Sequence, residues 1–73
     1  MNIVELGKWI AKERKEQGLI QDDLAGMIGQ SYSLISDLER ARRRGIGFDM
    51  LRRVVAALGY ELSFTVTKIE RKP

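Results

Sequence analysis

The feature that most constrains the fold is the stretch of residues 21–39, QDDLAGMIGQSYSLISDLE. Apolar residues recur there at the spacing of one helix face, on both sides of a break at Gly29, at positions Leu24, Ala25, Ile28, Ile35 and Leu38. This pattern predicts two short amphipathic helices joined by a tight turn.

The second of these helices is polar on its outer side. Ser31, Tyr32, Ser33 and Ser36 have side chains of the size and polarity that can contact the edges of DNA bases. The pattern is therefore that of a helix-turn-helix, in which the second helix enters the major groove.

Length and composition exclude most other classes of protein. With 73 residues the chain forms one small domain, and it contains neither Cys nor His. Thiolate and imidazole catalysis and the usual zinc and haem ligands are absent, so we expect no enzyme, no metal and no cofactor. The lack of disulfides and of an apolar run of roughly 20 residues predicts a cytoplasmic, nucleoid-associated protein without a membrane span.

The net charge of +3 is unevenly distributed. Six arginines lie between residues 40 and 53, accompanied by a single acid, Asp49. Such a cluster is typical of a phosphate-binding surface, and it also occurs on ordinary solvated faces.

Helical periodicity continues on both sides of the central stretch. A capping box begins a first helix near residue 3, Gly18 and Gly59 act as stop signals, and Ser31 is the expected N-cap of the third helix. The four expected helices cover approximately residues 3–17, 21–28, 32–40 and 48–58.

The period changes after Gly59. Residues 60–67 alternate, which predicts a β-strand whose apolar side includes Leu62, Phe64 and Val66. Nothing else in the chain alternates, so we expect this strand to pair antiparallel with its own copy in a homodimer. A frayed tail, or a strand added to another protein's sheet, are the alternatives. The predicted organisation is a helix-turn-helix domain (1–59), a dimerisation strand (60–67) and a charged tail (68–73).

Over residues 3–59 the sequence resembles the Xre/Cro/repressor helix-turn-helix family. The matching positions are Leu6, Ile10, Arg14, Leu19, Gln21, Leu24, Ala25, Ile28, Gly29, Ser31, Ile35, Ser36, Leu38, Glu39, Leu51, Leu58 and Gly59. The resemblance implies an all-α, compact four-helix (lambda-repressor-like) domain, to which this chain adds the single C-terminal strand.

The resemblance also implies roles for individual residues. Arg14 and Glu39 match an internal ion pair. We expect contacts with bases from Gln30, Tyr32, Ser33, Ser36 and Asp37, and contacts with phosphates from Gln21, Ser31, Arg40, Arg42, Arg43 and Arg44. Asp37 could accept a hydrogen bond from a cytosine amino group, repel wrong sequences, or bond to Ser33 or to a neighbouring arginine.

Two departures from the family pattern affect helix ends. Ile20 replaces the usual Ser, Thr or Asn, which removes the N-cap side chain of the second helix. Ala41 replaces the usual Gly after the third helix, so that helix either ends there or continues into the arginines at 42–44.

A four-helix body followed at once by a strand is most similar to the HipB-type antitoxins. The likeness implies a dimeric repressor that binds the palindromic operator of its own operon, with a HipA-like kinase toxin as partner. The alternatives are a stand-alone or phage-type Xre/Cro regulator without a toxin, and a module that acts mainly through protein interactions.

Overall fold

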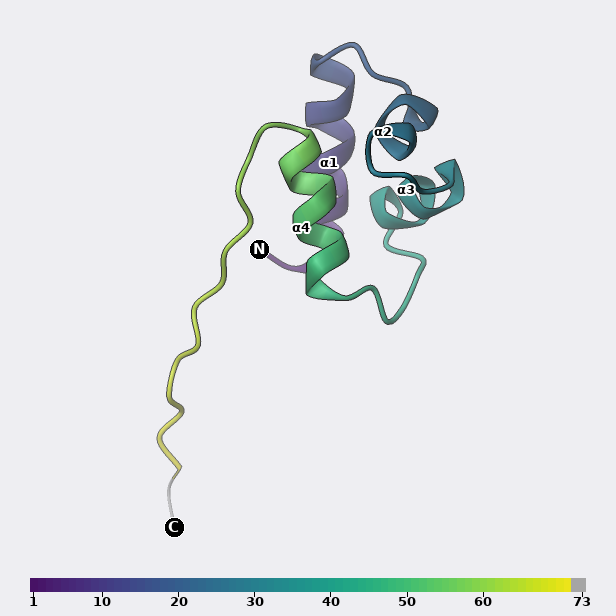
Figure 1. Cartoon of the computed structure of the whole chain (residues 1–73). Helices are drawn as coiled ribbons and strands as arrows, with labels where there is room; N and C mark the ends of the chain where they lie inside the picture. The colour runs from purple at the N-terminus through teal and green to yellow at the C-terminus, as the bar shows by residue number, and fades with distance from the viewer. Residues whose placement is uncertain (72–73) are drawn as a thin grey trace.

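The computed structural model describes residues 1–71, and in these residues the chain forms four helices (Figure 1). They are α1 (Ile3–Glu16), α2 (Gln21–Met27), α3 (Tyr32–Glu39) and α4 (Phe48–Ala57). α3 packs against both α1 and α2, and α4 also contacts α2. The all-α architecture predicted from the apolar periodicity is confirmed, with helix bounds within one or two residues of the expected positions.

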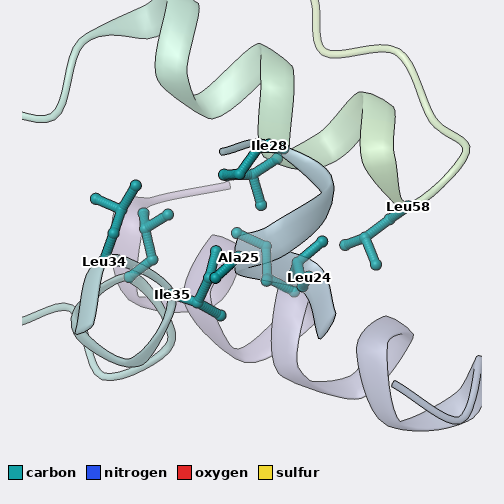
Figure 2. Close-up of a cluster of buried hydrophobic side chains, with 9 residues drawn as sticks. Leu24, Ala25, Ile28, Leu34, Ile35 and Leu58 are labelled. Atoms are coloured by element: carbon teal, nitrogen blue, oxygen red, sulfur yellow. The ribbon is translucent and has the colours of Figure 1, made fainter. Parts of the chain in front are cut away.

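Every helix contributes to one apolar core. The fully buried large side chains come from all four helices and are Ile10, Leu24, Ile35, Leu38 and Val54. Figure 2 shows Leu24, Ala25 and Ile28 from the α2 segment gathered near Leu34 and Ile35 of α3, with Leu58 closing one end. Each fully buried aliphatic side chain contributes about 1.5–3 kcal/mol, so this cluster holds the helix-turn-helix in place.

All four helices end in the same hydrogen-bonded turn. The second residue past each helix takes a left-handed backbone, and the next amide donates back into the last turn, as Arg42 N does to Asp37 O at 2.8 Å. Glycine holds the left-handed position after α1, α2 and α4, whereas Ala41 holds it after α3 with φ +54°. α3 therefore ends at Glu39, and it does not continue into the arginines.

A glycine sets the distance between α1 and α3. Gly7 is buried, and a Cβ at this position would clash with the carbonyl oxygen of Leu38 and lie 3.0 Å from that of Glu39. The absence of a side chain lets the backbone of α1 approach the end of α3.

The segment after α4 is extended, and it forms no strand within the described residues 1–71 (Figure 1). The prediction of a strand over residues 60–67 is therefore not met in the single chain, because a strand requires a hydrogen-bonded neighbour and the rest of the described chain is helix and loop. Residues 72 and 73, the end of the expected charged tail, lie outside the described residues.

The predicted alternation of this segment nevertheless has a physical basis. The ring of Tyr60 meets that of Trp9 edge-on at 4.9 Å, and the ring of Phe64 meets that of Phe48 in the same way at 4.6 Å. Leu62, between them, is half-buried. The apolar side of the segment thus packs on the helices as far as Phe64.

Candidate nucleic-acid interface

The turn between α2 and α3 fixes the angle of the predicted recognition helix. Gly29 takes a left-handed backbone with φ +66°, and the amide of Gln30 donates to Ala25 O at 2.9 Å. Because Ile28, Leu34 and Ile35 are buried on either side of this turn, the opposite face of α3 is left exposed.

The expected base-reading residues lie together at the start of α3. Gln30, Tyr32 and Ser33 are exposed, and Tyr32 has 56 % of its surface accessible. Ser36 and Asp37, one turn further along the same helix, are half-buried. An exposed phenol, amide and hydroxyl at the start of one helix can reach donors and acceptors in a groove.

Ser31 occupies the N-cap position of α3, as expected, but its side chain makes no capping hydrogen bond. The start of α3 therefore has unpaired amides beside an uncommitted hydroxyl. Both are groups that can donate to a phosphate.

The predicted ion pair between Arg14 and Glu39 is confirmed. Arg14 Nε donates to Glu39 Oε2 at 2.6 Å and Nη2 donates to Oε1 at 2.9 Å, while Nη1 donates to Leu19 O at 2.8 Å. Both side chains are almost fully buried. The hydrogen bonds from Arg14 to Glu39 raise the pKa of Arg14 above its ordinary value, although burial opposes the shift.

Gln21, the expected phosphate contact at the start of α2, is linked to this ion pair. Its amide Nε2 donates to Glu39 Oε1 at 3.1 Å. Since a carboxamide has two N–H groups, this bond orients the side chain and leaves one donor for a further acceptor.

The start of α2 lacks a side-chain N-cap, as the sequence predicts. Ile20 is 62 % exposed and does not compensate by packing. Instead, Asp23 accepts a hydrogen bond from the amide of Ile20 at 2.9 Å, which satisfies one of the free amides at this helix end.

The six arginines between residues 40 and 53 divide into two groups. Arg53 donates to the carbonyl of Ile28 at the end of α2, and Arg52 lies over the ring of Phe48, so the two arginines of α4 have structural contacts. The other four are exposed and lie in the C-terminal turn of α3 and the loop beyond it. They are Arg40, Arg42, Arg43 and Arg44.

Asp37 is paired with one of these loop arginines. Arg43 Nε donates to Asp37 Oδ2 at 3.1 Å, and Arg43 Nη2 lies 3.0 Å from the same oxygen. Of the roles considered for Asp37, the structure therefore favours a bond to a neighbouring arginine.

Little else in the described part of the chain suggests other chemistry. Within residues 1–71, no three acidic side chains gather where a metal ion could be held. None of the helices in the same residues is long and apolar enough to span a membrane.

A comparison with protein families decides the classification. The family model described as helix-turn-helix matches residues 10–64, which include the second half of α1 and the whole of α2, α3 and α4. The chain belongs to this helix-turn-helix family, which is of the Xre type. Membership indicates a DNA-binding transcription regulator. A search of curated proteins finds no match.

Proposed function

We propose that this helix-turn-helix protein is a sequence-specific transcriptional repressor that binds a palindromic operator as a homodimer. The observation that carries the proposal is the juxtaposition of exposed Gln30, Tyr32 and Ser33 with four exposed arginines just after the same helix. The first set offers base-specific contacts, and the second offers charge for phosphates.

The C-terminal segment supports the homodimer. The apolar side of its outer part is largely exposed, with Phe64 68 % and Val66 85 % accessible. An extended backbone with one apolar side exposes both hydrogen-bonding groups and hydrophobic surface, which a second antiparallel copy would cover. We assign Leu62, Phe64 and Val66 to this contact.

A dimer has a direct consequence for the DNA site. Two copies of α3 related by a two-fold axis would enter successive major grooves, about 34 Å apart. The half-sites are then inverted repeats, and each is read by the same residues.

We further propose that the protein is the antitoxin of a HipA-like kinase toxin and represses its own operon. Support for this role comes from the sequence layout, in which an immediate C-terminal segment follows a four-helix body as in HipB-type antitoxins. Co-expression with the product of the adjacent gene tests it. A stable complex with a protein kinase, and relief of that kinase's toxicity, are expected. A neighbouring gene that encodes no toxic partner would favour a stand-alone regulator.

Base readout is tested by the double variant Y32A/S33A, with exposed Met27→Ala as a matched control. Operator fragments enriched from a random duplex library by the wild-type protein serve as probes. We expect the double variant to lose about 1–3 kcal/mol of discrimination between the enriched and a scrambled site, whereas M27A keeps it. Equal discrimination by Y32A/S33A and the wild type would remove both residues from base recognition.

A further inference from the structure

The pair formed by Asp37 and Arg43 joins the recognition helix to the loop beyond it. Its members are partly accessible, with 34 % and 43 % of their side chains exposed. The pair therefore lies at the protein surface, and Asp37 lies one helical turn after Ser33 on the helix that carries the expected base-reading residues.

The geometry of the pair leaves a particular edge of the guanidinium free. Nε and Nη2 of Arg43 both face Asp37 Oδ2, so the carboxylate occupies the side edge of the fork. Among the described residues Arg43 has no other hydrogen-bond partner. The terminal edge, with one N–H on each Nη, is therefore available, and its two parallel donors match the O6 and N7 acceptors of guanine.

We propose that Arg43, held by Asp37, reads a guanine in the major groove of each half-site. Asp37 is the positioning residue, because its carboxylate limits the orientation of the guanidinium before DNA is bound. The inference rests on the proposed function and deepens it, since it names one base that the operator must contain.

The loop does not need this ion pair for its own structure. The backbone bonds of Arg42 N to Asp37 O at 2.8 Å and of Ala41 N to Leu38 O at 3.2 Å already fix the turn. An exposed ion pair adds little to stability in any case. Conversely, an unpaired Asp37 would repel DNA phosphates, and pairing with Arg43 removes that repulsion.

Arg44 provides the matched comparison. It is an exposed arginine of the same loop, with no hydrogen-bond or ion-pair partner among residues 1–71. A mobile guanidinium of this kind is suited to a phosphate, to which it contributes charge without base preference.

The test is selection of sites from a random duplex DNA library by the full-length wild type and by R43A, R43K, D37N and R44A. Circular dichroism first establishes that each variant has the wild-type helix content. We expect the wild type to prefer guanine at one position of each half-site by about 5- to 150-fold. R43K should lose that preference alone, because lysine keeps the charge but lacks the fork. R43A should lose the same preference and also bind all sequences more weakly, because it removes a positive charge.

D37N distinguishes positioning from simple charge neutralisation. If Asp37 orients Arg43, D37N lowers the guanine preference and leaves affinity for scrambled DNA unchanged or higher. R44A should instead weaken binding to all sequences alike and reduce the salt slope by about 1 for each copy, which is about 2 for the proposed homodimer.

Each other outcome overturns a stated part of the inference. Uniform weakening by R43A, with the guanine preference intact, would make Arg43 a phosphate contact and end the inference. An unchanged guanine preference in D37N would remove Asp37 from positioning. A library from which the wild type enriches no sequence would instead refute the proposed function itself.

Discussion

At the end of α3, Ala41 has a backbone conformation that usually belongs to glycine. Its φ of +54° is required because the amides of residues 41 and 42 both donate back into the helix. A Cβ in the left-handed region costs about 1–2 kcal/mol. This residue directs the chain out of α3, so the strain helps to place the arginine loop beside the recognition helix.

We expect Ala41→Gly to raise the free energy of unfolding by about 0.5–1 kcal/mol, after allowance for the greater freedom of glycine in the unfolded chain. Urea denaturation followed by the fluorescence of Trp9 measures it. Gly59→Ala, at a φ of +91° after α4, is the reciprocal control and should destabilise the protein. Reduced stability of A41G would show that Ala41 bears no strain.

Between elements, the backbone of α1 comes close to the end of α3 at Gly7. In an exposed helix, replacing Gly by Ala usually stabilises the protein by up to about 1 kcal/mol. Here the added methyl group would meet backbone carbonyls, which cannot move without shifting α1 from α3.

We therefore expect Gly7→Ala to lower the free energy of unfolding by about 1–3 kcal/mol despite its better helix propensity. Gly26→Ala in α2 is the matched control, because a Cβ there meets nothing within 4 Å, and it should stabilise. Thermal denaturation monitored by circular dichroism gives both values. Stabilisation by both variants would contradict the packing argument.

The contact between Tyr60 and α1 gives the C-terminal segment a pH dependence. The Tyr60 hydroxyl donates to Glu13 Oε2 at 3.1 Å, and this bond and the charge of Glu13 raise the pKa of Tyr60 above its ordinary value. A folded-state pKa above the unfolded one means that the contact stabilises fully below the ordinary tyrosine pKa. That contribution is lost as the pH rises through the folded-state pKa.

We expect Glu13→Gln to lower the pKa of Tyr60 towards its ordinary value, as measured by tyrosinate absorbance in a Tyr32→Phe background, where Tyr60 is the only tyrosine. Glu16→Gln should shift it less, because Glu16 acts only at longer range and contributes least. An unchanged pKa in E13Q would mean that the hydrogen bond does not form in solution.

The helices could be predicted well from the sequence because each buries one apolar face. The spacing of the apolar residues on such a face is a local pattern. The sequence also predicted the grouping of Gln30, Tyr32 and Ser33, since residues this close in sequence at the start of one short helix stay together. The lack of space for a side chain at Gly7 could not be predicted from the sequence, because only the tertiary approach of α3 creates it. Residues 60–67 show a further limit: alternation reports an extended chain with one packed side, whereas strand hydrogen bonds depend on a second segment.

For the whole molecule, one chain carries one recognition helix, whereas the proposed two-fold site requires two. The segment beyond Phe64 extends past the helices (Figure 1), and the molecule measures 51 Å in its longest dimension against 22 and 19 Å in the others. Val66 is accessible, so its side chain contributes little to the stability of one chain. A change there can affect dimerisation without unfolding the monomer.

We expect Val66→Lys to weaken the homodimer and, with it, operator binding, because it places a charge in the proposed apolar contact. Thr65→Lys adds the same charge on the other side of the segment and should leave the dimer intact. Sedimentation equilibrium measures association of the protein, and binding to an enriched operator at several salt concentrations measures its consequence for DNA affinity.

If a dimer neutralises about 6–10 phosphates, its affinity falls by about 10³ to 10⁵ between 50 and 200 mM salt. A V66K monomer makes half of those contacts, so its salt slope should be about half as steep. A V66K protein that remains dimeric would remove the C-terminal segment from the dimer contact and leave the two-fold site to be explained by another surface.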